Sequence, residues 1–500
     1  MTDGAGSQVF DPFAWWAAAG PDRTALVEPR GERRWTYAQA NEAVAQWVGW
    51  LEAIGLRAGD RLAILASNRS EQLFLTLACG RLGLLVAPLN WRLAPAELAP
   101  ILRQFNPTLL IGEAGLHPLA RDAGAGERWR DLDRDVIPAV ADAVPSRTTT
   151  SVSADDGWIV LFTSGTTGAP KGAILPHRQV FWNAFATATG WALGPDEVVP
   201  VSTPLFHTGG LNVLAAPLWQ RGGTVVLLER FDAAEFLEVL ERERCTLAFA
   251  VPTQFVMLTE LPAWSRRLPA LRLVVSGGAA CPPSLAARIA APGYAFREGF
   301  GLTEFGPNCF TGSDKALHGE SGTVGLPLPM VDAEIRDDTG APVPRGTVGE
   351  LWLRGPMAFA GYLDDPSCTA ETLVNGWVRT GDLFVQDVAG EFAVRGRRKE
   401  MFISGGENVF PAEVEAVLAM HPDIAEVSVV GVADPRWGEV GRAFVVPRGA
   451  ALSSEAVLVH ARARLAAYKV PKQVTFLDAL PRLGSGKCDR ARLARWEEST

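Results

Sequence analysis

The stretch that most constrains this chain is an apolar run that leads directly into a loop of glycine, hydroxyl and lysine residues. Residues 158–162 (Trp-Ile-Val-Leu-Phe) are typical of a buried strand, and residues 163–172 (Thr-Ser-Gly-Thr-Thr-Gly-Ala-Pro-Lys-Gly) follow at once. Glycine lets backbone N–H groups approach a ligand closely, while the hydroxyls and Lys171 add donors and a positive charge. Such a loop favours phosphate binding. A flexible surface linker is the alternative interpretation, but the strand that feeds the loop argues against it.

The loop differs from the P-loop, in which Gly-Lys-Ser/Thr closes a glycine-rich turn and opens a helix. Here Gly168 is followed by Ala169 and Pro170, and Lys171 is followed by Gly172. Pro170 also removes a backbone donor at the point where the P-loop helix would begin. The phosphate site that we predict is therefore of another kind.

Strand and helix patterns alternate on both sides of this loop. Thr36 and Gln39 form a capping box before a helix that ends near Gly55. The further elements that we expect are strands at 61–65, 84–88, 223–228, 246–250 and 271–275, and helices at 71–82, 233–244 and 255–259. This alternation predicts an α/β fold with largely parallel sheets. Ligands of such sheets bind at the carboxyl ends of strands, where the glycine turn 276–279 would lie.

The sequence pattern changes from about residue 320, where short segments alternate with turn residues and so indicate β-hairpins. A basic cluster at 397–399 then precedes about 100 residues that predict a small α+β module. Its expected elements are helices at 412–419 and 454–467 and strands at 426–432, 443–446 and 473–477. We therefore expect one domain over residues 1–396 and a second over 397–500, with a hinge near 397–400.

Composition narrows the class of protein. A chain of 500 residues exceeds one compact core, and 48% hydrophobic with 21% charged residues is ordinary for a globular protein. A net charge of −9 argues against a general binder of nucleic acid or anionic membranes. The six cysteines are scattered, which favours reduced thiols. No signal peptide and no membrane-spanning run is visible, so we expect a soluble cytoplasmic protein.

Four further polar clusters follow strands or turns, at residues 204–210, 298–304, 380–382 and 481–487. Each has an ordinary explanation when taken alone. Phe300 would be a core residue and Asp382 a turn residue, His207 a buried histidine, and Lys487 a solvated charge near the C-terminus. Their joint occurrence in this order favours one binding site.

With these motifs the chain resembles the AMP-forming acyl-CoA synthetases, adenylation domains and luciferases, and is similar to fatty-acid–CoA ligases. The resemblance runs from about residue 35 to 490, and its most specific motifs are residues 163–171 and 397–415. It implies a large N-terminal domain of αβαβα-type sheets plus a distorted β-barrel, and a small, mobile α+β C-terminal domain. It also implies a reaction in which a carboxylate attacks the α-phosphorus of ATP, after which coenzyme A displaces AMP.

The resemblance further implies roles for individual residues. The 163–171 loop would bind the phosphates, and Glu304 would bind Mg²⁺. Phe300 would contact the adenine, and Asp382 and Arg397 would contact the ribose. Lys487 would act in adenylation. The catalytic set would be Lys487, Thr303, Glu304 and His207. The nucleotide-binding set would be Thr163, Ser164, Gly165, Thr166, Thr167, Gly168, Lys171, Gly277, Gly278, Ala279, Glu298, Gly299, Phe300, Gly301, Thr303, Asp382, Arg397 and Lys487.

Position within the resemblance also implies the remaining subsites. The acyl pocket would be lined by His207, Leu211, Val251, Ser276, Gly277 and Phe305. Coenzyme A would meet Ser404, Gly405, Gly406, Glu407 and Trp437, and Lys399 would be the hinge about which the C-terminal domain turns. Leu483 and Gly484 depart from the usual threonine and alanine, so the loop that carries Lys487 is expected to be looser.

The sequence predicts the identity of the acid less precisely than it predicts the residues of the nucleotide site. We expect a medium- or long-chain fatty acid, and hence a place in fatty acid metabolism, because small residues such as Gly209 and Gly299 leave room in the pocket. An aryl acid of the benzoate, cinnamate or succinylbenzoate type is the alternative. Loading of a carrier protein instead of coenzyme A, and a nucleotide-binding regulator without turnover, are further alternatives. The expected ligands are ATP, Mg²⁺, coenzyme A and a small carboxylic acid. A homodimer is an open alternative for the oligomeric state.

Overall fold

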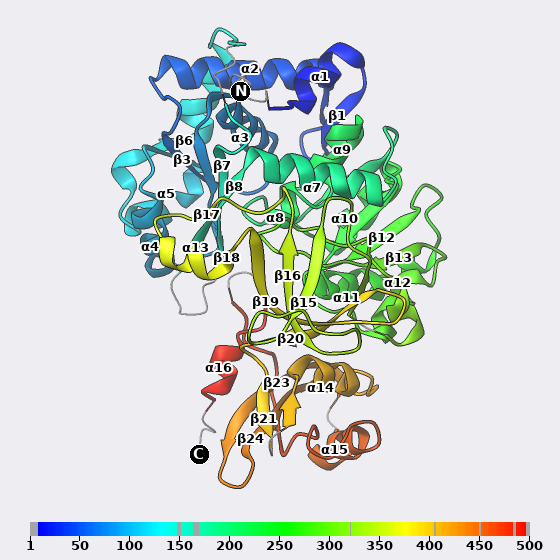
Figure 1. Ribbon diagram of the computed structural model, residues 1–500. Helices are drawn as coiled ribbons and strands as arrows, with labels where there is room; N and C mark the ends of the chain where they lie inside the picture. Colours follow the sequence, from blue (N-terminus) through cyan, green and yellow to red (C-terminus); the bar gives the residue numbers. More distant parts are fainter. Residues whose placement is uncertain are drawn as a thin grey trace.

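The computed structural model describes residues 9–147, 152–163, 170–320, 322–404, 407–449, 452–483 and 487–496. Figure 1 shows a large body built from the first four fifths of the chain and a smaller one formed by its C-terminal part. Three sheets belong to alternating α/β structure, one sheet is antiparallel, and a fifth belongs to the small domain. This mixed α/β architecture confirms the fold class predicted from sequence.

A seven-stranded sheet carries the loop motif with which the sequence analysis began. Its order is β17-β8-β7-β4-β3-β5-β6, and its strands are β3 (Arg61–Leu65), β4 (Leu85–Pro88), β5 (Leu109–Gly112), β6 (Trp129–Asp131), β7 (Gly157–Thr163), β8 (Lys171–Pro176) and β17 (Gly361–Tyr362). The pairs from β6 to β7 are parallel, whereas β7–β8 and β8–β17 are antiparallel. The prediction of a largely parallel sheet is therefore confirmed for its centre, and one edge is antiparallel.

Two smaller sheets complete the α/β layers. One has the order β2-β1-β10-β9, from β1 (Thr24–Glu28), β2 (Arg33–Thr36), β9 (Val198–Val201) and β10 (Thr224–Leu227). The other is wholly parallel, with β11 (Leu247–Ala250), β12 (Leu273–Ser276) and β13 (Ala295–Glu298). Ala250, Ser276 and Glu298 are register partners at the ends of these strands. The segments that follow them consequently emerge at one edge.

Helices form layers inside and outside these sheets. The inner layer, between the seven- and four-stranded sheets, contains α1 (Pro12–Ala19), α2 (Tyr37–Ala53), α3 (Ser70–Leu82), α7 (His177–Gly190) and α9 (Ala215–Arg221). Outer faces are covered by α4 (Pro95–Phe105), α5 (His117–Asp122), α10 (Ala233–Arg242), α11 (Pro252–Glu260) and α12 (Pro283–Ala290), and the shorter helices are α6 (Ile137–Ala141) and α8 (Thr208–Leu211). The predicted capping box of Thr36 and Gln39 opens α2, as expected.

An antiparallel sheet follows where hairpins were predicted. Its order is β14-β20-β19-β16-β15, with β18 paired to β19, from β14 (Thr323–Gly325), β15 (Asp332–Arg336), β16 (Gly349–Arg354), β18 (Leu373–Val374), β19 (Trp377–Gln386) and β20 (Phe392–Arg397). Helix α13 (Pro366–Thr372) lies between β17 and β18 in the chain. This sheet occupies the part of the fold for which the resemblance implied a distorted barrel.

The C-terminal domain has its own sheet and its own core. Strands β21 (Phe402–Ser404), β22 (Glu407–Val409), β23 (Ile424–Asp434), β24 (Gly438–Pro447) and β25 (Gln473–Phe476) pack with α14 (Pro411–Leu418), α15 (Ser454–Arg462) and α16 (Arg490–Ala494). Arg397 still pairs with Asp382 as the last residue of β20. We therefore propose that the domain boundary follows Arg397, within the hinge region 397–400. The helix expected over 454–467 ends at Arg462.

The composition led to expectations about the cysteines and about membrane-spanning segments. All six cysteines lie among the described residues, where none of them forms a disulfide, and four of them are buried. Among the described residues, no helix combines the length and the apolar character needed to cross a bilayer.

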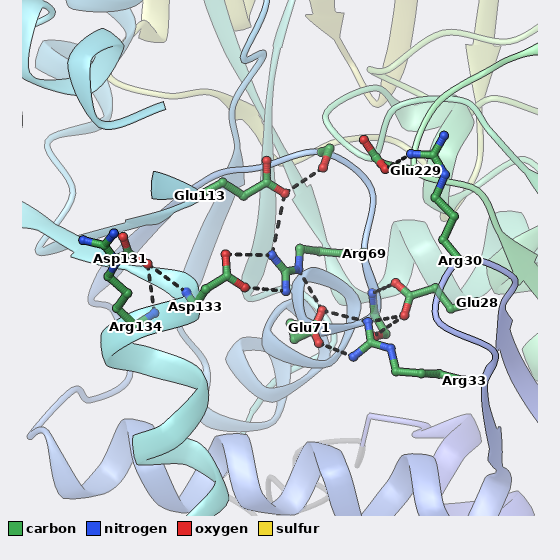
Figure 2. A network of polar contacts seen from close by, with 12 residues as sticks. Glu28, Arg30, Arg33, Arg69, Glu71, Glu113, Asp131, Asp133, Arg134 and Glu229 are labelled. Carbon is green, nitrogen blue, oxygen red and sulfur yellow. Dashed lines mark hydrogen bonds and ion pairs between the residues drawn. The ribbon is translucent and has the colours of Figure 1, made fainter. Parts of the chain in front are cut away.

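Ion pairs tie the start of α3 to neighbouring strands (Figure 2). Glu71 accepts from Arg33 at 2.5 Å and from Arg69 at 2.8 Å, and Arg69 reaches Asp133 at 2.9 Å. Arg33 also pairs with Glu28, whose carboxylate accepts the Ser70 N–H. Burial alone would raise the pKa of Glu71, but the two arginines outweigh it and hold that pKa at about 2. The ionised carboxylate therefore stabilises the folded state.

We expect Glu71→Gln to lower the free energy of unfolding by ~3 kcal/mol at pH 7, since a pKa depressed by one unit is equivalent to ~1.4 kcal/mol. The stabilisation is present above the unfolded pKa of about 4.3 and is lost as pH falls toward the folded pKa of about 2. Urea unfolding at pH 7, 5 and 4 should thus show a variant–wild-type difference that shrinks with falling pH. Glu42→Gln, at the exposed Arg147 pair, serves as control and should change little.

Candidate active site

The antiparallel edge of the seven-stranded sheet places Lys171 beside a group of polar side chains. Thr163 ends β7 opposite Lys171, which begins β8. The Lys171 amine donates to the Cys368 thiol at 3.0 Å and lies 5.2 Å from the centre of the Tyr362 ring. The Tyr362 hydroxyl donates to Glu304 Oε1 at 2.7 Å. One chain of contacts therefore joins the loop lysine to Glu304. The predicted loop residues Ser164, Gly165, Thr166, Thr167 and Gly168 lie outside the described residues.

Asp382 is a buried carboxylate at the end of the antiparallel sheet. It is 4% exposed; its Oδ1 pairs with Arg397 Nε at 2.8 Å, while its Oδ2 has no hydrogen-bond partner among the described residues. Burial raises the pKa of Asp382 to about 6, and the Arg397 charge opposes this rise. A buried oxygen without a donor is suited to accept a ligand hydroxyl.

Glu350 holds the part of β19 next to Asp382, which therefore lies in a strand and not in the turn expected from sequence. This carboxylate is buried, and its Oε1 accepts the Gly381 N–H at 3.1 Å. Its Oε2 meets Arg379 at 3.0 Å and Arg398 at 3.3 Å. The backbone next to Asp382 is thereby attached to the residue that precedes the predicted hinge, Lys399, an exposed residue of a short turn.

Lys487, from the C-terminal part of the chain, lies near Asp382 and Glu304. The residue keeps exposed surface, yet loss of solvation around its amine is the main cause that lowers the pKa of Lys487, and the Arg397 charge acts in the same direction. Asp382 and Glu304 raise it through their charges. These interactions place the amine within electrostatic range of both carboxylates. Gly484 to Gly486, which precede it, lie outside the described residues.

His207 lies on the opposite side of this group, in the turn before α8. Burial is the main cause that lowers the pKa of His207 to about 4, and the positive charges of Lys487 and Arg92 add to it. His207 is consequently neutral at physiological pH. Arg92 lies 4.9 Å from the Trp91 ring centre and 5.9 Å from that of Phe206.

Asn68 holds the segment that leads to His207. Its side-chain amide donates to the carbonyl oxygens of Thr203 and Leu228 at 3.0 and 3.1 Å, and its Oδ1 accepts the Leu205 N–H at 2.9 Å. Because Asn68 is 5% exposed, these are its structural partners. Sequence reasoning missed this residue, since nothing in the order of residues around it shows that it reaches across to residues 203–205.

The glycine turns at the edge of the three-stranded sheet form a further wall. Gly277 to Ala279 follow β12, and Gly299 to Thr303 follow β13, so their strands deliver them side by side. Gly278 has φ +82°, a conformation that favours glycine. Phe300 is half-buried and packs edge-on against Phe384, with centroids 4.9 Å apart. The Thr303 carbonyl accepts from Gln179 at 2.8 Å.

Glu298 is used differently from the other residues of its motif. It is 2% exposed, and its two carboxylate oxygens accept the N–H groups of Cys281 and Gly322 at 2.9 and 3.1 Å. Burial is the main cause that raises the pKa of Glu298 to about 7. The carboxylate thus anchors the turn after β12, and we propose that it shapes the nucleotide site indirectly.

Two small hollows flank α8. One is lined by Leu73, Thr76, Pro88, Ile159, Leu161, Leu205, His207, Leu211 and Asn212, and the other by Pro200, Val201, Thr203, Gly209, Val213, Leu214 and Phe249. The predicted pair His207 and Leu211 lines the first. Phe305 is fully buried in the main core and lines neither hollow. Val251 and Ser276 end up at the carboxyl edge, after β11 and in β12.

The residues predicted to meet coenzyme A lie on the small domain. Ser404 is buried at the end of β21, Glu407 is exposed at the start of β22, and Trp437 is 42% exposed with Arg436 over its ring. Gly405 and Gly406 lie outside the described residues. Tyr362 and Cys368 come from a segment to which the sequence analysis gave no role, although Tyr362 follows a glycine at a strand edge.

Glu304 fits the requirements of a magnesium ligand. In the described part of the chain, no three His, Cys, Asp or Glu side chains are grouped to hold a metal ion. Mg²⁺ needs no such cage, because one carboxylate together with phosphate oxygens and water completes its shell. Glu304 offers a half-buried carboxylate with one oxygen held by Tyr362.

Comparison with known proteins agrees with this geometry. A model of AMP-binding enzymes matches residues 13–363, and a model of the AMP-binding enzyme C-terminal domain matches 413–487. Feruloyl-CoA synthase of an Amycolatopsis species is 39% identical over 481 residues, covering 96% of this chain and 97% of that protein. The long-chain-fatty-acid–CoA ligase FadD13 of Mycobacterium tuberculosis is 32% identical, covering 94% and 95%.

A solved structure shows the same arrangement of domains. The o-succinylbenzoate CoA synthetase of Bacillus subtilis, in complex with its acyl-adenylate intermediate, superimposes with a TM-score of 0.88 at 29% identity, covering 96% of this chain and 97% of that one. The family models and these relatives identify an acid–thiol ligase that forms AMP. The chain belongs to the AMP-binding enzyme family.

We expect His207 to stay neutral down to about pH 5, because its pKa lies at about 4. Replacing Lys487 with alanine should raise that pKa, since the lysine charge lowers it. NMR titration of labelled histidine, with His207→Gln to assign the signal, measures both effects. A His207 signal that titrates near pH 6.5, or one that Lys487→Ala leaves unmoved, would contradict this placement of the two groups.

Proposed function

We propose that this AMP-forming acid–CoA ligase adenylates an aryl-substituted carboxylic acid with MgATP and transfers the acyl group to coenzyme A, releasing AMP and pyrophosphate. One observation carries the proposal: Tyr362 contacts both Lys171 and Glu304, and the Lys487 amine lies within electrostatic range of Glu304 and Asp382, although these residues come from distant segments. Two cations and two carboxylates in a partly desolvated place suit a nucleotide with its metal ion and an attacking carboxylate.

The nucleotide would bind along the edge formed by the glycine turns. Asp382 Oδ2, which lacks a donor among the described residues, would accept ribose hydroxyls. The free face of Phe300 would lie against adenine, and Lys171 would neutralise the terminal phosphates. Glu304 would hold Mg²⁺, which would offset phosphate charge. These are the roles that the resemblance implied, and we propose them here for the residues that the structure describes.

Lys487 would supply the charge that the adenylation step needs. As the acid oxygen attacks the α-phosphorus, negative charge builds on both groups, and an amine held between them stabilises that charge. Desolvation lowers the pKa of Lys487 and strengthens its interaction with anions, whereas Asp382 and Glu304 favour its protonated form. His207 is neutral and would border the acid without adding charge.

Thioester formation requires the same site after Lys487 has left. We propose that the C-terminal domain turns about Lys399, as the resemblance implied, and that residues 404–408 then approach the pantetheine. Trp437, half exposed beside Arg436, would meet the nucleotide part of coenzyme A. The stacked arginine gives that end of the domain a positive charge suited to phosphates.

An aryl acid fits the walls near α8 better than the fatty acid predicted from sequence. The ring of half-buried Phe249 lies between Gly209 and Gly277: a Cβ on Gly277 would stand 3.2 Å from that ring, and one on Gly209 would stand 3.8 Å from it. Gly209 and Phe249 both line the second hollow, and an aromatic wall suits an aromatic ring. Feruloyl-CoA synthase is also more similar to this chain than the fatty-acid ligase, at 39% against 32% identity.

A substrate screen tests this choice. Arylpropenoic, arylacetic and benzoic acids would be compared with straight-chain acids, with ATP, Mg²⁺ and coenzyme A, by pyrophosphate release and thioester formation. We expect an aryl acid to give the highest kcat/KM. Gly277→Ala should lower kcat/KM for that acid by about tenfold and for butyrate less, because the added methyl group meets Phe249.

Gly194→Ala is the matched control, since a Cβ there meets no atom within 4 Å. A highest kcat/KM for a long straight-chain acid would overturn the aryl proposal and support a fatty-acid ligase. Pyrophosphate release with any acid but no thioester with coenzyme A would point to a carrier protein as the acceptor.

Lys487→Ala should slow adenylation by ~100-fold or more, because it removes a preorganised charge from the attacking and attacked groups. Thioester formation from supplied acyl-AMP should survive. Acid-dependent exchange of pyrophosphate into ATP measures the first step, and thioester yield the second. Lys472→Ala, an exposed lysine of the same domain, should leave both rates unchanged. An unchanged exchange rate in Lys487→Ala would refute the assignment.

A further inference from the structure

Tyr362 contacts both of the charged groups proposed to meet the phosphates and the metal ion. Its hydroxyl donates to Glu304 Oε1 at 2.7 Å, and its ring lies under the Lys171 amine, 5.2 Å from ring centre to nitrogen. Glu304 and Lys171 have opposite charges, yet no ion pair within 4 Å joins these two described residues to each other. The tyrosine therefore contacts two described residues of opposite charge that do not pair with each other.

The backbone of Tyr362 is held firmly enough to fix that separation. Tyr362 is the register partner of Ala173 in the antiparallel pair of β17 with β8, the strand that begins with Lys171. Its N–H donates to Thr369 Oγ1 at 2.8 Å. The preceding Gly361 has φ +130°, and a Cβ there would stand 2.8 Å from the Thr369 methyl group, so only glycine allows this approach.

Helix α13 completes the arrangement from the other side of the lysine. Cys368 precedes Thr369 on this helix, and its sulfur accepts from the Lys171 amine at 3.0 Å. Lys171 is thus held by a thiol and an aromatic ring, both neutral groups. Contacts of this kind orient an ammonium group without cancelling its charge.

We propose that Tyr362 is the positioning residue of the MgATP site: it holds Glu304 and Lys171 apart and oriented, so that the carboxylate stays available to the metal ion and the ammonium to the phosphates. This inference rests on the proposed function of the site. The ring acts on the lysine and the hydroxyl acts on the carboxylate, so the two effects can be separated by substitution.

The contact between Tyr362 and Glu304 has a defined direction. The tyrosine hydroxyl donates, because an ionised carboxylate can only accept. One Glu304 oxygen is occupied by this bond, and the other remains to bind a cation.

Equilibrium binding of ATP to the full-length protein, without any acid, tests the proposal. Calorimetry would give the association constant for ATP in excess Mg²⁺ and again in EDTA. The ratio of the constant in Mg²⁺ to the constant in EDTA is the metal-dependent gain in affinity. Tyr362→Phe keeps the ring and loses the hydroxyl. We expect its affinity in EDTA to equal that of the wild type, and its metal-dependent gain to fall by about tenfold.

Tyr362→Leu and Cys368→Ala separate the two halves of the arrangement. Tyr362→Leu should weaken ATP binding in EDTA as well, because the lysine loses its aromatic contact. Cys368→Ala should change binding in EDTA but leave the metal-dependent gain intact, since Cys368 contacts the lysine and not Glu304. Tyr468→Phe, an exposed tyrosine of the C-terminal domain, is the control and should match the wild type.

An undiminished metal-dependent gain in Tyr362→Phe would overturn the proposal, and so would equal losses of affinity with and without Mg²⁺. These outcomes are independent of the acid and of coenzyme A. If the wild type binds MgATP and the tyrosine variants behave as expected, while no acid supports AMP release, the proposed function fails and the positioning role stands.

Discussion

The pairing of Asp382 with Arg397 is the contact on which the arrangement of the site depends. It joins β19 to β20 beside the predicted hinge region 397–400, and it gives a buried carboxylate its counter-charge. A carboxylate that is 4% exposed would be costly without a counter-charge, and its elevated pKa shows how far burial opposes ionisation. Arg397 compensates this cost in part, and Glu350 holds the adjacent part of β19 and Arg398 together. A structural ion pair therefore involves the carboxylate that we propose to bind the ribose, beside the predicted hinge.

Asp382 and Arg397 are paired beside the predicted hinge, whereas the described residues Lys171 and Glu304 are held by other groups and not by each other. Lys487 approaches from the C-terminal part of the chain within electrostatic range of Asp382 and Glu304, while Tyr362 contacts both Glu304 and Lys171. A site for a highly charged nucleotide needs groups of both signs that stay available in the absence of ligand. Neutral partners, such as the Tyr362 ring and the Cys368 thiol, orient them without neutralising them. Burial keeps His207 neutral as well, where we propose that the acid binds.

Sequence patterns predicted most of the strands and helices of the α/β layers, because buried strands and amphipathic helices leave strong local signals. The strand 61–65 has the predicted bounds, and the capping box at Thr36 opens its helix. The antiparallel edge formed by β8 and β17 was not predicted, since β17 is two residues long and joins strands nearly 200 positions away in the chain. Helix α15 also ended five residues before its expected end.

The same contrast applies to the candidate site. The sequence by itself determined the family, the mixed α/β class and the set of charged side chains, because these follow from residue type and order. Only the tertiary structure decided which of them share one place: that Glu298 is occupied by backbone amides, that Phe305 belongs to the core, and that Asn68, Tyr362 and Cys368 reach the site. The physical reason is that hydrogen bonds and burial depend on distances between segments remote in the chain, which local periodicity does not encode.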